Sequence, residues 1–257
     1  MPRRPWRAGP RAPTIERMTD VRPVALVTGA NKGLGRETVR RLAGSGWLVL
    51  LAARDRERGT QAAATLADEG LDVEFVELDV TSDESAEAAV RAVAERVDHL
   101  DALVNNAGVA GPMLDPADVE AAALRRLYEV NVFGQVRVTR AFLPLLRKSE
   151  RPRIVMVSSA LASLEHASDP ARPEYGFLSL DYASSKAALN MIVSQYARAL
   201  PGFKVNAADP GNPATDMNRH TGVHTVAEGV EAIIRLATLD DDGPTGGFFD
   251  RNGPVPW

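Results

Sequence analysis

A strand, a glycine-rich turn and a helix follow one another between residues 24 and 43, and this succession most limits how the chain can fold. The apolar run 24–27 has the length of a buried strand, and segment 36–43 carries apolar residues at helical spacing. Gly29, Gly33 and Gly35 lie in the turn between them. Because glycine has no Cβ, peptide N–H groups and the positive end of the helix can face a pyrophosphate. The turn predicts a dinucleotide site, with a purely structural turn as the alternative, since Gly-x-x-x-Gly-x-Gly differs from the commoner fingerprint.

The rest of the chain alternates apolar runs of strand length with helical segments. We expect strands over 47–53, 73–78, 100–104, 154–157, 203–208 and 246–249. Helices are expected over 61–69, from the cap Ser82-x-x-Ser85 towards Val97, and over 116–147, 181–200 and 226–239. Within the long fourth helical stretch, the β-branched residues and the glycine of 130–134 are poor helix formers. Nearly all-apolar strands alternating with helices predict an α/β fold: a Rossmann-like doubly wound parallel sheet of about seven strands with helices on both faces.

The first 20 residues differ in composition from the remainder. Residues 1–17 contain five arginines and four prolines and have almost no apolar periodicity. We therefore expect a disordered extension over 1–20 and one dinucleotide-binding catalytic domain over 21–257. A transit peptide is an alternative for the extension, and Met18 is an equally suitable start.

Composition excludes several classes of function. The net charge of −4 gives no basic surplus, so neither a nucleic-acid partner nor an anionic membrane is expected. The absence of cysteine excludes disulfides and thiolate ligands and is compatible with a reducing compartment. No apolar run reaches the roughly 18 residues of a membrane span. These features predict a soluble, cytoplasmic protein.

Polar motifs follow the predicted strands. They are Thr28-Gly29, Arg54, Asp79, Asn105 to Gly108, Ser158-Ser159 and Pro210-Gly211. In a doubly wound sheet the carboxyl ends of the strands lie at one edge, where ligands bind. A single crevice is therefore expected to collect all of these motifs.

Tyr182 and Lys186 lie four residues apart on a predicted helix, so their side chains can approach each other. A tyrosine has a pKa of about 10 and is a poor acid-base catalyst at neutral pH, but a neighbouring cation favours the phenolate and lowers this pKa. Such a pair can pass a proton at pH 7. Taken alone, the spacing is common and equally typical of an exposed tyrosine and lysine.

In this context the sequence resembles the short-chain dehydrogenase/reductases over residues 24–257. The resemblance rests on Thr-Gly-x-x-x-Gly-x-Gly at 28–35, Asn-Asn-Ala-Gly at 105–108, Asn131, Ser159, Tyr-x-x-x-Lys at 182–186 and Pro-Gly at 210–211. It implies reversible hydride transfer between a nicotinamide cofactor and a carbonyl or alcohol. Tyr182 would protonate the carbonyl oxygen, Ser159 would polarise it, and Lys186 would hold the nicotinamide ribose and lower the tyrosine pKa. Asn131 would support a proton relay through a water beside Lys186, and Ser158 is the alternative to Ser159.

The same resemblance implies the residues that bind the cofactor. They are Gly29, Asn31, Lys32, Gly33, Leu34, Gly35, Arg54, Asp79, Val80, Asn105, Ala107, Gly108, Tyr182, Lys186, Pro210, Gly211 and Thr215. Members that use NAD usually carry an acid at the end of the second strand, where this chain has Ala53. Arg54 and Lys32 are cations suited to a 2′-phosphate, so we expect NADP(H), with NAD(H) as the alternative because Asp55 lies about 20 residues beyond the turn.

Within the family, the segments 246–257 and 215–217 resemble the carbonyl reductase branch, as does the extended gap between Ser159 and Tyr182. Asn212-Pro213 departs from this branch, which often has an apolar or aromatic residue there. The resemblance implies an NADPH-dependent reductase of aldehydes or ketones with a small-molecule substrate, acting as a monomer or homodimer. The extra segment would cover a helix face that relatives use to dimerise, or wall the substrate pocket.

Three alternatives stay open from the sequence. One is a catalytically silent NADP(H)-sensing protein, and the others are family enzymes that reduce a C=C bond or epimerise a substrate. His220, His224 and Asp216 are spaced as on a metal-binding helix face, but Thr221-Gly222 disfavours a helix there. We expect no metal site.

Overall fold

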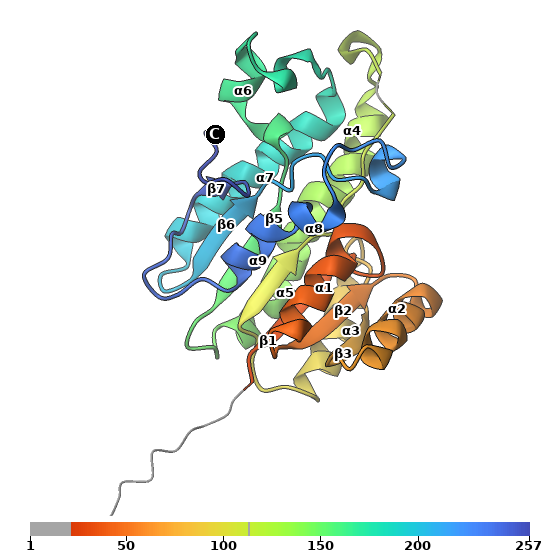
Figure 1. The fold of residues 1–257 in the computed structure, drawn as a ribbon, viewed down its shortest axis with the longest axis vertical. Helices are drawn as coiled ribbons and strands as arrows, with labels where there is room; N and C mark the ends of the chain where they lie inside the picture. The colour runs from red at the N-terminus through yellow and green to blue at the C-terminus, as the bar shows by residue number, and fades with distance from the viewer. Residues whose placement is uncertain (1–21, 113) are drawn as a thin grey trace, which may run out of the picture.

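Seven parallel strands form one sheet in the order β3-β2-β1-β4-β5-β6-β7 (Figure 1). The computed structural model describes residues 22–112 and 114–257, so the extension predicted over 1–20 lies outside the described residues. The strands are β1 (Val24–Thr28), β2 (Leu48–Ala53), β3 (Val73–Glu77), β4 (Ala102–Asn105), β5 (Arg153–Val157), β6 (Lys204–Ala208) and β7 (Phe248–Phe249). The predicted doubly wound α/β fold is confirmed.

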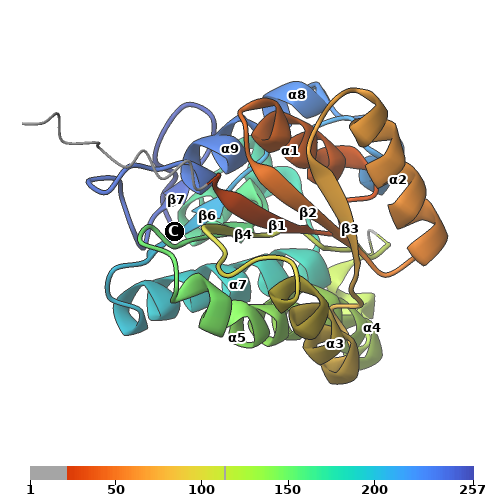
Figure 2. The same cartoon turned by 90° about the horizontal axis from the view of Figure 1, so that it is seen from below.

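Helices cover both faces of the sheet (Figure 2). One face carries α1 (Gly33–Gly44), α2 (Arg56–Asp68), α8 (Val226–Gly229) and α9 (Glu231–Ala237). The other carries α3 (Asp83–Ala94), α4 (Ala121–Tyr128), α5 (Gly134–Leu146) and α7 (Leu180–Ala199). The short helix α6 (Leu164–Ser168) lies in the extra segment between β5 and α7.

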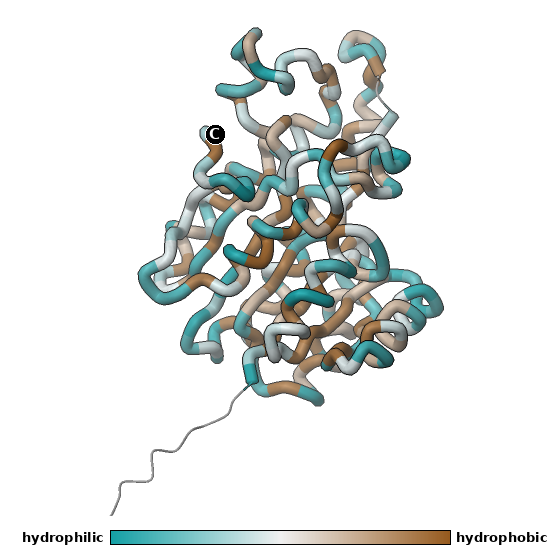
Figure 3. Tube along the Cα trace, viewed as in Figure 1, coloured by the Kyte–Doolittle hydropathy of each residue, from teal (hydrophilic) through white to brown (hydrophobic). Residues whose placement is uncertain are grey.

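The strands contribute side chains to two separate hydrophobic cores, because successive side chains of a strand point to opposite faces of the sheet. Along β1, Leu26 belongs to the core that includes buried residues of α3, α5 and α7, whereas Val27 belongs to the core that includes buried residues of α1, α2 and α9. Both side chains are fully buried. Figure 3 shows hydrophobic residues concentrated along the central strands of the sheet. This burial on both sides explains the almost uninterrupted apolar strand sequences.

The helical stretch expected over 116–147 is interrupted. A 3₁₀ turn (Pro116–Asp118) precedes α4, and a π-helical turn (Glu129–Phe133) separates α4 from α5. At Gly134, where α5 begins, an added Cβ would lie 2.9 Å from Val80 Cγ2, so only glycine allows this close approach to the end of β3. The helix expected over 226–239 is likewise divided into α8 and α9.

The sheet reverses its winding between β1 and β4. β1 pairs with β2 on one side and with β4 on the other. Such a reversal opens a crevice at the carboxyl ends of the strands, which is the usual ligand position in open α/β sheets. The topology therefore brings the segments that follow β1, β2, β4, β5 and β6 to one edge.

Candidate active site

The glycine turn after β1 is tied to the Asn-Asn-Ala-Gly segment after β4. The hydroxyl of Thr28 accepts the N–H groups of Asn106 and Ala107, each at 2.9 Å. The Asn106 amide donates in return to Thr28 O at 2.8 Å. The two segments thus form one connected floor at the crevice.

The three glycines of the turn have different reasons to be glycine. A Cβ on Gly29 would lie 2.9 Å from Ala107 Cα, and one on Gly35 would lie 2.6 Å from Asn106 Nδ2. Those two glycines are required for the close packing of the turn against its neighbours. A Cβ on Gly33 would meet only Thr215 Cγ2, at 3.8 Å, so this glycine faces open space. Its φ of +55° also favours glycine.

The first turn of α1 suits a bound phosphate. Lys32 occupies the N-cap position and makes no capping bond with its side chain, and the first turn contains no acidic residue. The leading N–H groups of a helix have no partner within the helix and carry its positive end. Gly33 and Leu34, the first two residues of α1, carry such groups at the crevice. The residues present therefore fit the pyrophosphate of a dinucleotide.

At the end of β2, Arg54 and Asp55 have different surroundings. Arg54 is exposed, and its charge helps to lower the pKa of Asp79 at the end of β3. Burial raises the pKa of Asp79, but two hydrogen bonds from Thr81 and the charges of Arg54 and Arg137 outweigh it. Asp55 accepts the N–H of Arg58 at 3.0 Å and caps α2, which explains why this helix begins earlier than expected.

Lys32 forms an ion pair that the sequence did not indicate. Its amine lies 2.7 Å from Asp216 Oδ2, in the segment after β6. The second oxygen of Asp216 lies 2.9 Å from His220 Nε2. The pair joins the glycine turn to the segment after β6 across the crevice.

Lys186 and Tyr182 converge on the end of β5. The Lys186 amine donates to Val157 O at 2.7 Å and lies 5.7 Å from the centre of the Tyr182 ring. Burial lowers the pKa of Lys186 to about 8. Burial also raises the pKa of Tyr182 to about 12; hydrogen bonding with Ser159 opposes this rise, and the charge of Asp209 adds to it. The direction for Tyr182 is opposite to the predicted one because burial exceeds every favourable contribution.

The two serines after β5 point to different partners. Ser158 is fully buried, and its hydroxyl donates to Asn190 Oδ1 at 2.6 Å. Ser159 lies close enough to the Tyr182 phenol to lower its pKa, and its hydroxyl accepts the N–H of Leu161 at 3.3 Å. Ser159 is therefore the serine that shares the crevice with Tyr182.

Asn131 lies in the π-helical turn, where its side chain is fully buried. Its amide oxygen accepts the N–H of Val109 and its amide nitrogen donates to Val109 O, each at 2.9 Å. A Cβ on Gly108 would lie 3.4 Å from Asn131 Oδ1 and 3.5 Å from Lys186 Nζ. Gly108 thus lies between Asn131 and Lys186.

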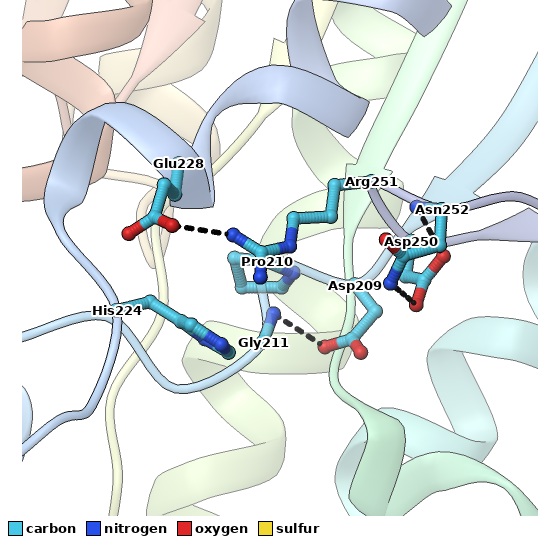
Figure 4. A pocket seen from close by; sticks show the side chains of 8 residues that line it. All are labelled: Asp209, Pro210, Gly211, His224, Glu228, Asp250, Arg251 and Asn252. Atoms are coloured by element: carbon cyan, nitrogen blue, oxygen red, sulfur yellow. Dashed lines mark hydrogen bonds and ion pairs between the residues drawn. The ribbon is translucent and has the colours of Figure 1, made fainter.

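Other predicted residues line the same edge. Asn105 donates to Thr139 Oγ1 at 3.0 Å, and Val80, in the segment after β3, packs against Gly134 at the start of α5. Pro210 and Gly211 line a pocket of about 80 Å³ behind the turn after β6 (Figure 4). Thr215 faces Gly33 across the crevice. All these residues follow strands at the edge where Tyr182 and Lys186 lie.

The histidines near Asp216 do not form a metal site. His220 pairs with Asp216, whereas His224 Nδ1 accepts the N–H of Asn212 at 3.2 Å. Across residues 22–112 and 114–257, no group of three or more His, Cys, Asp or Glu side chains could hold a metal ion. Nor does any helix in that part of the chain have the length and apolar character to cross a membrane.

Comparison with known proteins decides the family. Residues 23–224 match the model of the short chain dehydrogenases. The chain belongs to this family. As a short chain dehydrogenase, it is an NAD(P)-dependent oxidoreductase.

Relatives of this short chain dehydrogenase include named reductases. The (+)-neomenthol dehydrogenase of Arabidopsis thaliana is 34% identical, over 88% of this chain and 95% of that protein. The structure of salutaridine reductase from Papaver somniferum superposes with a TM-score of 0.78 at 30% identity, over 89% of this chain and 99% of the other. An NADPH-bound carbonyl reductase from chicken fatty liver superposes with a TM-score of 0.82 at 28% identity, over 92% and 100% of the two chains.

Proposed function

We propose that this protein reduces the carbonyl group of a small apolar molecule to an alcohol with NADPH. The observation that carries the proposal is the convergence of Tyr182, Ser159 and Lys186 beside the floor that Thr28 ties together. The bound cofactor would supply the hydride. The chain itself would position the substrate and deliver the proton.

Each of the three side chains has a distinct task in this proposal. The Tyr182 phenol donates its proton to the carbonyl oxygen. The Ser159 hydroxyl donates a hydrogen bond to the same oxygen and stabilises the negative charge that develops there. The Lys186 amine, held by Val157 O, presents its remaining N–H groups to the cofactor's ribose.

Asn131 would act on the arrangement of the crevice. Its side chain bonds both backbone groups of Val109 and therefore fixes the segment after β4 beside Lys186. Placement in a π-helical turn, which recurs at functional sites, turns this amide inward. We infer that Asn131 holds Gly108 in a position that leaves room for the relay water proposed beside Lys186.

The preference for NADPH rests on charge at the end of β2. Arg54 is exposed there, and Asp55 is engaged in capping α2. Arg54 can therefore meet a 2′-phosphate, as can Lys32 when it leaves Asp216. The chicken carbonyl reductase, solved with NADPH, has the same overall fold.

The substrate class follows from apolar side chains around the crevice. Exposed hydrophobic residues occur after β4, at the start of α7 and just before it, and after β6; Val109 is 37% exposed and Leu178 is 61% exposed. They include Val109, Leu114, Leu178, Leu180 and Met217. Because these segments follow strand ends at the same edge of the sheet, their exposed apolar side chains favour an apolar ligand. Relatives named for neomenthol and salutaridine agree with a bulky hydrophobic carbonyl compound.

The replacement Tyr182→Phe tests the proposal. It should lower kcat for reduction of apolar cyclic ketones by roughly 10³-fold while NADPH still binds, because only the phenolic proton is lost. Ser158→Ala is the matched control, since that hydroxyl bonds Asn190 and lies outside the proposed reaction. NADPH oxidation and product analysis provide the readout. Substantial turnover by Tyr182→Phe would contradict the role of the phenol.

The same assay separates the other candidate functions. A sensing protein would bind NADPH but oxidise none across ketones, aldehydes and quinones. Products with a reduced C=C bond or an inverted centre would identify the other two family activities. NADH run beside NADPH tests the role of Arg54, since equal kcat/KM would contradict it.

A further inference from the structure

A buried glutamine beside the crevice has no task in the reaction proposed above. Gln135 is the second residue of α5 and is only 1% exposed. Its amide nitrogen donates to two backbone oxygens, Ala107 O at 2.6 Å and Val130 O at 3.0 Å. Both partners can only accept, so the amide must present its nitrogen to them. The Gln135 side-chain oxygen has no partner within the described part of the chain, so the residue acts through its two donated hydrogen bonds.

One of these bonds supports the π-helical turn. This turn includes Val130, and its backbone closes through the N–H of Gly134, which donates to Glu129 O five residues back. Such turns are single interruptions of an α-helix. The Gln135 amide adds a bond to a carbonyl inside the turn. It therefore stabilises the backbone that directs Asn131 towards the segment after β4.

The other bond holds a residue that already touches the glycine turn. The Ala107 N–H donates to the Thr28 hydroxyl at 2.9 Å, and the Ala107 oxygen accepts from Gln135. A Cβ on Gly29 would lie 2.9 Å from Ala107 Cα, so these two backbones are also in contact. Ala107 thus joins the floor of the crevice to the π-helical turn, and Gln135 makes that joint.

Gly108 lies between two residues that amide side chains hold. Gln135 bonds the carbonyl that precedes it, and Asn131 bonds the N–H and the oxygen of Val109, which follows it. Gly108 also lies between Asn131 and the Lys186 amine. The two amides together therefore fix the backbone beside this amine.

The same turn is bonded to the helix that carries the phenol. Asn131 Nδ2 donates to Ser185 Oγ at 3.1 Å, and the Ser185 hydroxyl donates to Tyr182 O at 2.7 Å. Ser185 is fully buried. Hydrogen bonds therefore lead from Ala107 through Gln135 and the π-helical turn to the backbone of α7.

We propose that Gln135 is a positioning residue of the active site, which fixes the spacing between the floor of the crevice and the π-helical turn that faces Lys186 and α7. It acts through Gly108 and Asn131 rather than by touching the reacting groups. Its effect on turnover rests on the proposed function. Because a displacement of roughly 1 Å between reacting groups can lower a rate by about 10²-fold, this spacing matters for hydride and proton transfer.

The replacement Gln135→Met removes both donors and keeps a side chain of similar length. It should lower kcat by roughly 10-fold, while the Kd of NADPH and the KM of the ketone stay within about 2-fold of wild type. Binding should persist because the Thr28 hydroxyl still holds the floor. Gln135→Asn shortens the amide by one methylene, so that it no longer reaches both oxygens. It should lower kcat in the same way, and it decides the test if Gln135→Met does not fold.

Asn206→Leu is the matched control. Asn206 is also an amide that is 1% exposed, and its nitrogen donates to a backbone oxygen, Pro244 O at 2.8 Å. Its bonds fasten β6 to the segment before β7 and do not involve the π-helical turn. Asn206→Leu should therefore lower the thermal unfolding temperature, as Gln135→Met does, but leave kcat within about 2-fold of wild type. A loss of stability alone would lower kcat in neither variant.

Hydrogen exchange of backbone N–H groups tests the positioning without turnover. Exchange over residues 106–109 should be roughly 10-fold faster in Gln135→Met than in wild type, and unchanged in Asn206→Leu. This result supports the proposal even if the protein reduces no carbonyl compound, in which case only the proposed function fails. Wild-type exchange over 106–109 in Gln135→Met would overturn the proposal. So would an unchanged kcat of Gln135→Met in an active enzyme, or equal effects of Asn206→Leu.

Discussion

The buried amine of Lys186 should lower the stability of the fold, and its replacement by methionine should raise that stability at neutral pH. Lys186 is 4% exposed, and burial lowers its pKa from 10.5 to about 8. An unfolded chain holds the lysine proton up to its ordinary pKa, whereas the folded chain releases it earlier. The unfolded state therefore binds more protons between these two values, and the free energy of unfolding of the wild type rises with pH across that range.

The magnitude follows from the two pKa values. Charging the buried amine costs about 3.4 kcal/mol at pH 7 and about 1.4 kcal/mol at pH 9.5. Methionine has a similar length and no charge, but it leaves Val157 O without its hydrogen bond, which costs about 1 to 2 kcal/mol. Lys186→Met should therefore gain about 1 to 2 kcal/mol at pH 7 and lose this advantage near pH 9.5.

Urea unfolding at both pH values measures this difference. Lys204→Met is the matched control, because Lys204 also donates to a backbone oxygen, Gly243 O at 2.6 Å, but is only partly buried. Its effect on the free energy of unfolding should be nearly equal at the two pH values. A Lys186→Met protein that is less stable than wild type at pH 7, or whose difference from wild type is the same at both pH values, would refute the reasoning. Activity should be lost in Lys186→Met in either case.

Three further replacements test packing, cofactor binding and capping. Gly134→Ala should lower the free energy of unfolding by about 1 to 3 kcal/mol in urea titrations, because its Cβ would press on Val80; a neutral result would contradict the close approach. Asp216→Asn should free Lys32 and tighten NADPH binding by roughly 2- to 5-fold at low salt, measured by calorimetry, and unchanged affinity would show that the pair does not compete with the cofactor. Asp55→Ala should lower stability by about 1 kcal/mol through loss of the α2 cap, without changing the ratio of NADPH to NADH kcat/KM.

The sheet could be predicted from the sequence because each strand is buried on both faces. A run such as 24–27 has no polar residue that would indicate exposure, and the motif after each strand marks its carboxyl end. The interruption of the helical stretch at 130–134 was also indicated, because β-branched residues and glycine weaken a helix. The structure places the π-helical turn at Glu129–Phe133.

The contacts between loops could not be predicted. Lys32 and Asp216 are separated by 184 positions, and no periodicity relates them. Asp209 is an ordinary acid in the sequence, and only the pairing of β5 with β6 shows that it lies beside Ser159. The Tyr182 pKa was expected to fall, because sequence spacing reveals the nearby lysine but not the extent of burial. Such quantities depend on how segments meet, and local sequence does not encode that.

The two hydrogen bonds that the Thr28 hydroxyl accepts from the Asn106 and Ala107 N–H groups affect the energetics of cofactor binding. The surface that would receive the pyrophosphate is assembled by protein-protein hydrogen bonds and by the contact of Gly29 with Ala107, before any ligand arrives. Binding of the dinucleotide therefore requires little further ordering of the protein on that side, so the entropic cost of binding is small there. The segment after β6 contacts the turn through the exposed Lys32–Asp216 pair. Conformational changes that accommodate different ligands should therefore be concentrated in the segment after β6.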